Sequence, residues 1–272
     1  MAINGIARRY LPRLIWPWLQ YSKAKFLVWR FSNRSVMHNY GGHILTVHLH
    51  DPMSEQWYDH DCERPKEIDL LSASRLQKGS TVFDIGAHQS IVAMLLAKEV
   101  GDSGRVIAVE PNPFNVGVAK LNLASNGIQN VTQLQAMISS TSGVGRVSFQ
   151  LNSNPVHAEL GNWGRKVPSV TLNDLSEQFG VPDVVYLDVE GYESEALRAA
   201  DRVLNLPTDW CIELHGDEVL RSFGSSNSDI VKRFLTAGFD VHIMDGQKNP
   251  IEVKSERHVP MIRCHMVAIR PD

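Results

Sequence analysis

Two acidic residues and a glycine stand at the ends of two apolar segments of this 272-residue sequence. In "TVFDIGAHQS", Asp84 and Gly86 follow an apolar run. In "RVIAVEP", a second run ends on Glu110, 24 residues after the glycine. A glycine after a strand lets the backbone approach a ligand closely, and a carboxylate at the end of the next strand can accept both hydroxyls of a ribose. The pattern therefore indicates a nucleoside site.

The single glycine of this loop distinguishes the site from a dinucleotide site. A dinucleotide-binding loop carries G-x-G-x-x-G, whose glycines serve the turn, the pyrophosphate and the helix packing. Here the loop is D-I-G-A-H-Q-S, and no Lys or Arg lies near it to meet a phosphate. Asp84 would repel a pyrophosphate but suits a cationic amine. A ligand with a ribose, an adenine and an ammonium group is S-adenosylmethionine, and an NAD-dependent oxidoreductase is the disfavoured rival.

The segments that position these residues alternate between strands and helices from Pro65 onward. The expected strands are "STVFDIGA", "GRVIAVEP", "VTQLQAMIS", "DVVYLDVEG" and "DWCIELHG", with apolar-faced helices between them. The stretch from Ser139 to Gly164 is rich in Ser, Gly and Asn, which is typical of a hairpin and loop excursion. This alternation predicts a parallel sheet with helices on both faces. The two last strands, "DVHIMD" and "MIRCHMVAIR", are joined without a helix.

The third and fourth strands end in residues that suit the same ligand. Gln135 and Ala136 follow the third strand, where an amide and a small residue can lie against adenine. Asp188 and Glu190 follow the fourth strand, next to the expected position of the sulfonium. Ligands of open α/β sheets bind beyond the carboxyl ends of the strands, so these residues are expected to converge.

The set "VFDIGAHQS", "VIAVEPNP", "LQAMIS", "SVTLNDL", "VVYLDVEGYESEALRAA" and "CIELHG" resembles the FkbM family of S-adenosylmethionine-dependent methyltransferases. The resemblance covers about residues 65–270. It implies a class I methyltransferase, Rossmann-like α/β fold: a seven-stranded, mostly parallel sheet with an antiparallel last strand and helices on both faces. It also implies O-methylation of a hydroxyl. The expected cofactor-binding residues are Asp84, Gly86, Ala87, His88, Ser90, Glu110, Pro111, Asn112, Asn115, Gln135, Ala136 and Asp188.

The loop departs from the family pattern D-x-G-A-N-x-G at two positions. His88 replaces the Asn, and Ser90 replaces the second Gly. Ser90 is small, so close packing of the following helix is expected to survive. His88 is expected to donate a hydrogen bond to the carboxylate of the cofactor. A catalytically inactive methyltransferase fold that binds a partner or a membrane is the alternative that this variation leaves open.

Transfer to an alcohol needs a group that accepts the hydroxyl proton near the transition state. His215 is the first candidate for this general base because its ordinary pKa is near neutral. Asp188 and Glu190 are the further catalytic candidates, and Glu213, two residues before His215, is expected to orient the ring. No metal site is predicted. A Mg²⁺ ion held by Asp188, Glu213 and His215 is the alternative, since some O-methyltransferases use it.

The methyl acceptor is expected to be a hydroxyl-bearing small molecule, such as a sugar, a lipid-linked glycan or a secondary metabolite. Family members that this chain resembles act on sugars, lipids, polyketides and peptides. The loops at 40–64 and 139–165 would select among them, because Trp57 and Tyr58 can stack on a ring or cap the core.

Charge and aromatic residues set the N-terminus apart. Residues 1–50 hold seven Lys and Arg and no Asp or Glu, so the remainder carries −10 when the whole chain carries −3. We expect residues 1–64 to be a basic, aromatic extension and loop, and residues 65–272 to be the methyltransferase domain. An acidic body disfavours nucleic acid as a partner. The extension is expected to pack on the body or a second subunit, with peripheral membrane contact through residues 1–40 as the alternative.

The cysteines and the apolar segments bear on location. Cys62, Cys211 and Cys264 are far apart and odd in number, which favours free thiols in a reducing compartment. No stretch approaches the roughly 20 apolar residues that a membrane span needs. The chain is therefore expected to be cytoplasmic, with peripheral attachment to a membrane as the alternative. The sequence predicts no oligomeric state.

Overall fold

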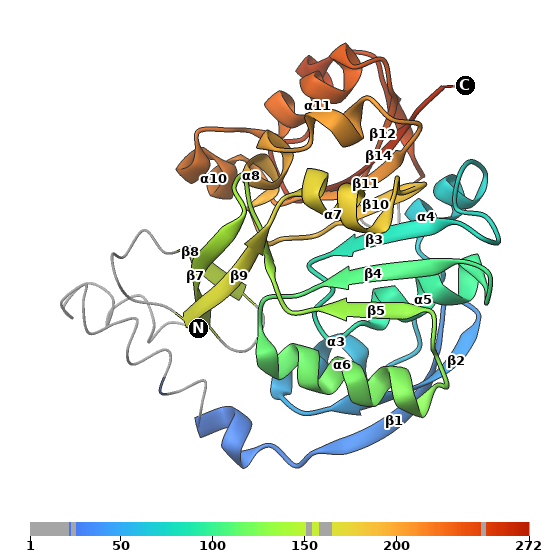
Figure 1. Cartoon of the computed structure of the whole chain (residues 1–272), viewed down its shortest axis with the longest axis vertical. Coiled ribbons are helices and arrows are strands. Elements are labelled where there is room, and N and C mark those ends of the chain that lie inside the picture. The colour runs from blue at the N-terminus through green and yellow to red at the C-terminus, as the bar shows by residue number, and fades with distance from the viewer. Residues whose placement is uncertain (1–21, 23–25, 151–153, 158–164, 246–248, 272) are drawn as a thin grey trace.

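An eight-stranded sheet forms the centre of the structure (Figure 1). The computed structural model describes residues 22, 26–150, 154–157, 165–245 and 249–271. Within these residues the strand order is β13-β12-β14-β11-β10-β3-β4-β5. Neighbours from β11 to β5 pair in parallel, and β14 is antiparallel to both β11 and β12. The strands are β3 (Thr81–Ile85), β4 (Arg105–Val109), β5 (Val131–Leu134), β10 (Val184–Leu187), β11 (Asp209–Leu214), β12 (Asp240–Met244), β13 (Ile251–Val253) and β14 (Cys264–Ile269).

This sheet confirms the expected fold class, a mostly parallel Rossmann-like sheet whose last strand is antiparallel. The additional strand, β13, comes from the polar connection between the two last expected strands and pairs with β12 at the edge. Strands β10 and β11 are buried along their whole length. Both faces of a parallel sheet are covered by helices, which is why β10 is a continuous apolar run and β11 has the apolar core Trp210–Ile212.

Two apolar clusters fill the space between the sheet and the helices on its two faces. One lies under α7, α8, α9 and α11 and contains Trp210 and Phe234, whose ring centroids are 5.4 Å apart. The other lies under α4 and α5 and contains Met94 and Tyr40. The helices of these layers are α4 (Lys66–Ser72), α5 (Ile91–Val100), α6 (Pro113–Ser125), α7 (Leu172–Phe179), α8 (Glu193–Arg198), α9 (Asp201–Leu204), α10 (Asp217–Leu220) and α11 (Asn227–Thr236).

A second, smaller sheet stands at the edge where the parallel strands end (Figure 1). Its strand order is β6-β9-β7-β8. The hairpin expected after the third strand is the antiparallel pair β7–β8. The strands are β6 (Met137–Ile138), β7 (Gly143–Gln150), β8 (Asn154–His157) and β9 (Arg165–Val170). This sheet therefore adds a wall beside the expected ligand site.

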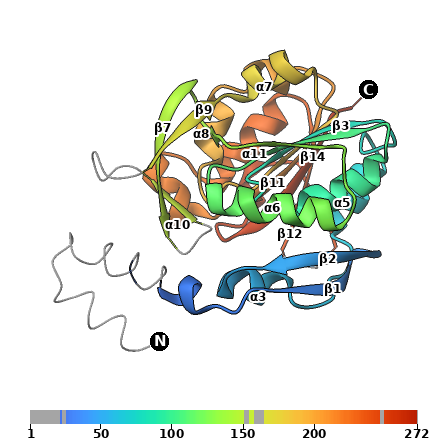
Figure 2. The same ribbon diagram turned by 60° about the horizontal axis from the view of Figure 1, so that its bottom comes forward.

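An N-terminal hairpin and helix form a further layer below α5 and α6 (Figure 2). They are β1 (Arg34–Tyr40), β2 (His43–Leu49) and α3 (Pro52–Tyr58). The backbone N–H of His48 in β2 donates to Oδ1 of Asn122 in α6 at 2.7 Å. The sequence indicates a short strand followed by a polar loop between residues 40 and 63. The structure has strand β2 there, but β2 pairs with the unexpected strand β1, and the expected loop contains a helix capped by Asp51. The segment thus packs on the body.

Most of the basic and aromatic extension, residues 1–21 and 23–25, lies outside the described residues. The predicted membrane contact through residues 1–40 therefore stays a prediction. Among the described helices, none combines the length and the apolar character that crossing a membrane requires.

Candidate active site

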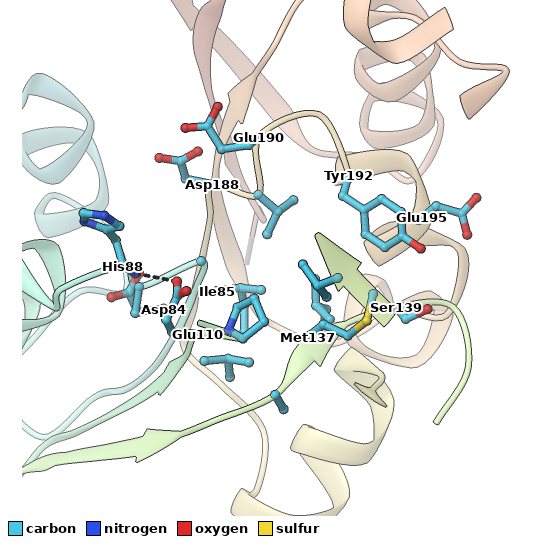
Figure 3. Close-up of a pocket in the computed structure, with 18 of the residues that line it drawn as sticks. Asp84, Ile85, His88, Glu110, Met137, Ser139, Asp188, Glu190, Tyr192 and Glu195 are labelled. Atoms are coloured by element: carbon cyan, nitrogen blue, oxygen red, sulfur yellow. Dashed lines mark hydrogen bonds between the residues drawn. The ribbon is translucent and has the colours of Figure 1, made fainter. Parts of the chain in front are cut away.

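A cavity of about 610 Å³ opens at the carboxyl ends of β3, β4 and β10, beside the second sheet. This is the edge at which open α/β sheets bind ligands, and the volume lies within the usual range for small-molecule sites. Figure 3 shows an acidic end with Asp84, Glu110, Asp188 and Glu190. The other end carries Tyr192, Met137, Ser139 and Glu195.

Glu110 is held in place at the end of β4 by three donors. Its Oε2 accepts from the backbone N–H of His88 at 3.0 Å. Its Oε1 accepts from the backbone N–H of Asn112 at 2.8 Å and from Nδ2 of Asn115 at 3.2 Å. Burial raises the pKa of Glu110 to about 7, although these hydrogen bonds act in the opposite direction. The orientation of the carboxylate is thus fixed before a ligand arrives.

Gly86 lies where the loop after β3 touches the loop after β10. Its φ is +90°, and a Cβ at this position would lie 1.7 Å from the carbonyl oxygen of Asp188. The backbone N–H groups of Gly86 and Ala87 both donate to the carbonyl of Val109, at 2.9 and 3.0 Å. Only glycine fits such an approach at positive φ. The glycine that the sequence assigned to ligand approach therefore also brings the two loops together.

Three residues other than glycine have a positive φ within the described chain: His88 at 47°, Ser90 at 66° and Glu190 at 53°. All three lie in the two loops at the cavity. Such conformations cost energy and concentrate at functional sites. The Oγ of Ser90 donates to Oε1 of Gln133 at 2.8 Å. Ser90 thus occupies a backbone conformation that favours glycine and faces β5 rather than the cavity.

Asp84 and Asp188 each have a buried carboxylate oxygen without a hydrogen-bond partner among the described residues. Burial and the neighbouring charge of Glu110 raise the pKa of Asp84 to about 7. Burial and the charge of Glu213 raise the pKa of Asp188 well above its usual range. Buried carboxylates without a partner are stabilised by a cation. The cavity therefore fits a ligand that brings positive charge to this end.

His215 lies behind Asp188 and Glu190 and is not on the cavity wall. Its side chain is 5% exposed, and Nε2 is 3.2 Å from Oε2 of Glu190 and 3.7 Å from Oδ1 of Asp188. Its Nδ1 is 2.6 Å from Oε1 of Glu193, a fully buried residue. Burial lowers the pKa of His215, but hydrogen bonds to Glu190 and Glu193 outweigh it and raise the pKa to about 10. The ring is therefore an imidazolium at neutral pH.

The expectation that Glu213 orients His215 is not met by its carboxylate, which faces Arg263. Burial opposes the charge of Glu213, but its hydrogen bond to Arg263 lowers its pKa to about 2. Glu193 holds the imidazole instead. The ligand atoms of Asp188, Glu213 and His215 lie within 4.8 Å of one another, a spacing that suits a metal ion. Because an imidazolium and a guanidinium already face these carboxylates, we assign no metal here.

The structure divides the predicted site residues into two groups. On the cavity wall are Asp84, Gly86, Ala87, His88, Glu110, Pro111, Ala136, Asp188 and Glu190. Behind the wall are Ser90, Asn112, Asn115 and His215, and Gln135 is exposed and does not line the cavity. The residues that the sequence analysis missed are Gln133, Glu193 and Arg263. Glu193 stands in the "DVEGYE" segment that carried the resemblance, so its position was the available signal.

Comparisons with known proteins identify a related family. The family model for the methyltransferase FkbM domain matches residues 84–241. The hexuronic acid methyltransferase AglP of Haloferax volcanii is 24% identical over 168 residues, which are 60% of this chain and 67% of that protein. An arsenite methyltransferase of Halobacterium salinarum is 34% identical over 70 residues, 26% of this chain. The chain spans only 17% of the length of that relative.

Two solved structures can be superposed on much of the chain. An S-adenosylmethionine-dependent O-methyltransferase from Thermotoga maritima has 14% identity and a TM-score of 0.47, covering 87% of this chain and 77% of that one. A methyltransferase FkbM from Methylobacillus flagellatus has 15% identity and a TM-score of 0.45, covering 69% of this chain and 43% of that one.

Proposed function

The chain belongs to the FkbM family of S-adenosylmethionine-dependent methyltransferases, and we propose that it methylates a hydroxyl of a sugar, a lipid-linked glycan or a secondary metabolite. One observation carries the assignment of the cofactor. The fixed carboxylate of Glu110 stands beside buried oxygens of Asp84 and Asp188 that have no hydrogen-bond partner within the described residues. A ligand with a ribose and positive charge meets both requirements, and S-adenosylmethionine has both.

The residues at the acidic end divide the cofactor among them. Glu110 accepts the ribose hydroxyls, and Pro111 and Ala136 lie against the adenine. Asp84 receives the ammonium group, and Asp188 faces the sulfonium. The cofactor supplies an activated methyl group, so the chain has to position the acceptor and take its proton.

The charges around Asp188 match a cationic ligand. Four carboxylates, those of Asp188, Glu190, Glu193 and Glu213, face the imidazolium of His215 and the guanidinium of Arg263. With every group charged, the cluster carries a net charge of −2 (four negative and two positive charges). This excess of negative charge raises the pKa of Asp188, and a sulfonium nearby would lower it.

The position of His215 changes the role that we propose for it. Asp188 and Glu190 line the cavity, whereas His215 does not. We therefore propose that the carboxylate of Asp188, which lies beside Glu190, accepts the proton of the acceptor hydroxyl. His215 is a positioning residue that holds both carboxylates from behind and is itself held by Glu193.

The opposite end of the cavity suits a hydroxylated ring. The rings of Tyr192 and Phe223 lie edge to face, with centroids 5.5 Å apart. Ser139 and Glu195 add polar groups beside them. Aromatic faces and a few polar groups are what a sugar needs for orientation. The similarity to a methyltransferase of hexuronic acids supports a glycan acceptor.

The experiment is calorimetric titration with S-adenosylmethionine and S-adenosylhomocysteine, with NADH as the control. We expect micromolar binding of the first two, no binding of NADH, and loss of binding in Glu110→Ala. A screen of sugars and lipid-linked glycans with radiolabelled cofactor should then give label that resists mild alkali, as an ether does and an ester does not. Failure to bind either cofactor form would support the inactive-fold alternative. Label lost in alkali would overturn O-methylation of a hydroxyl.

A further inference from the structure

The helix α3, which precedes the matched family region, is attached to the loop after β3. Oδ1 of Asp51 caps α3 by accepting from the backbone N–H groups of Met53 and Ser54, both at 2.9 Å. Oδ2 of the same carboxylate accepts from Nε2 of Gln89 at 2.9 Å. Asp51 is 1% exposed. The capped end of the helix is therefore fixed to the residue that follows His88.

The other end of α3 brings two aromatic side chains against His88. The hydroxyl of Tyr58 is 3.0 Å from Nδ1 of His88. The indole ring of Trp57 lies edge to face with the imidazole at a centroid distance of 5.3 Å. All three residues line the cavity. Nε2 of His88 is buried and has no hydrogen-bond partner within the described residues.

The phenol of Tyr58 determines which nitrogen of His88 carries the proton. Within the part of the chain that the structure describes, Nδ1 is the hydrogen-bond partner of this hydroxyl. If Nδ1 carried the proton, the buried phenol proton would have no acceptor, and an unmet donor is costly. The phenol therefore donates to Nδ1. The bond made by one ring nitrogen sets the state of the other, so the proton of the neutral ring is on Nε2.

We propose that α3 is part of the cofactor site, and that Tyr58 fixes His88 as a neutral Nε2–H donor to the carboxylate of bound S-adenosylmethionine. The proposal rests on the proposed function. The ammonium and the carboxylate of the cofactor share one carbon atom. Figure 3 shows His88 beside Asp84, the residue assigned to the ammonium, on the same side of the cavity. The carboxylate of the cofactor then needs a donor at this place, and Nε2–H of His88 is available.

The environment keeps this donor neutral. Burial lowers the pKa of His88 to about 4, and the charges of Asp51 and Glu190 raise it only in part. A neutral imidazole with Nε2–H supplies the same hydrogen bond as the amide of the Asn that the family loop carries. The positive φ of His88, 47°, directs the side chain toward Tyr58 and the cavity. His88, held by Tyr58, thus makes the hydrogen bond that the Asn of the family loop would make.

Nuclear magnetic resonance of the ¹⁵N-labelled imidazole rings tests the proton position without any ligand. His88 is assigned by its absence from the spectrum of His88→Asn. We expect the Nε2–H form in the whole chain, unchanged from pH 6 to pH 8. Tyr58→Phe should give a mixture of the two forms. Tyr186→Phe removes a phenol from the same cavity, one that donates to Glu67, and should leave the His88 signals unchanged. An Nδ1–H form in the wild type would overturn the proposal.

A double-mutant cycle on S-adenosylhomocysteine binding tests the link to the cofactor. Tyr58→Phe should weaken binding about fivefold, the typical value of one hydrogen bond. We expect His88→Asn alone to bind within about threefold of the wild type. In this background Tyr58→Phe should have no effect, because an amide donates the hydrogen bond without a choice of tautomer. An equal loss in both backgrounds would show that Tyr58 acts by packing and would overturn the proposal. Absence of binding in the wild type would instead refute the proposed function, while the tautomer would remain measurable.

Discussion

The two histidines near the cavity are held in opposite charge states. His88 is on the wall, its Nδ1 faces a phenol, and burial lowers its pKa to about 4. His215 is behind the wall, its nitrogens face the carboxylates of Glu193, Glu190 and Asp188, and its pKa rises to about 10 against the effect of burial. Burial acts on both rings in the same direction. The neighbours decide the outcome.

The difference suggests different roles for two parts of the acidic end of the cavity, one beside His88 and one in front of His215. A neutral ring can donate to an anionic group without adding charge, which suits the binding of a carboxylate. A charged ring behind two carboxylates compensates them and fixes their positions. Under the proposed function, the loop after β3 therefore binds the cofactor, and the loops after β10 and β11 serve to accept the proton of the hydroxyl. The loops after β3 and β10 touch at Gly86, so this contact fixes the position of one loop relative to the other.

The largest expected effect is the separation of these two loops by Gly86→Ala. The new Cβ would meet the carbonyl oxygen of Asp188 at 1.7 Å, at a φ of +90°. We expect a loss of about 2–5 kcal/mol in the free energy of unfolding, from overpacking and from the positive φ. Urea denaturation followed by circular dichroism measures it.

Gly127→Ala is the matched control for this change. Its φ of +63° is also positive, but no atom lies within 4 Å of the new Cβ. It should cost about 1 kcal/mol, the conformational part alone. Equal losses of unfolding free energy in both variants would mean that the contact between the loops after β3 and β10 contributes nothing to stability. The two parts of the site would then not be linked through Gly86.

The fold was largely predictable because it depends on local patterns. The strands β3, β4, β10 and β11 are short, mainly apolar runs, each followed by a helix, and "TVFDIGA" and "RVIAVEP" show this pattern in the sequence. Strand β13 was missed since it has three residues and lies in a polar connection. In the N-terminal segment the sequence indicated a strand where β2 lies but missed β1 and α3, since β1 forms by pairing with β2 and α3 lies in the segment read as a polar loop.

The site was predictable at strand ends and not beyond them. Glu110 and Asp188 follow β4 and β10 directly, and Asp84 is the last residue but one of β3, so their convergence follows from the topology. Whether a residue lies on the wall or behind it depends on tertiary contacts, so the sequence could not indicate that His215 and Asn115 do not line the cavity. The contact between Tyr58 and His88 joins residues 30 positions apart in different elements.

The second largest expected effect concerns the imidazolium of His215. His215→Gln removes the imidazolium, which should lower kcat about 10²-fold for the hydroxyl acceptor found in the screen. Affinity for S-adenosylhomocysteine should change little, since the ring does not line the cavity. Without the positive charge, the pKa of Asp188 rises further, so the ascending limb of kcat against pH should move to higher pH. Steady-state rates from pH 6 to pH 10 measure both.

Charge rescue separates this role from simple packing. His215→Lys retains a positive charge and should recover part of the lost rate, whereas His258→Gln, at an exposed position of the short helix 256–258, should behave as wild type. If kcat fell while the pH profile kept its position, His215 would be a packing residue, and the contrast with His88 would concern structure alone.

The smallest expected effect concerns the carboxyl group of Asp84. Burial and Glu110 raise the pKa of Asp84 to about 7, so the ligand-free carboxyl is partly protonated near neutral pH. A bound ammonium favours the charged carboxylate, which releases a proton, and affinity for S-adenosylmethionine should rise about tenfold from pH 6 to pH 8. Calorimetry in two buffers of different ionisation enthalpy counts the proton. Asp84→Asn should weaken binding and reduce this pH dependence, while Glu177→Gln, on the exposed face of α7, should retain it. An affinity independent of pH would show that Asp84 does not meet the cation.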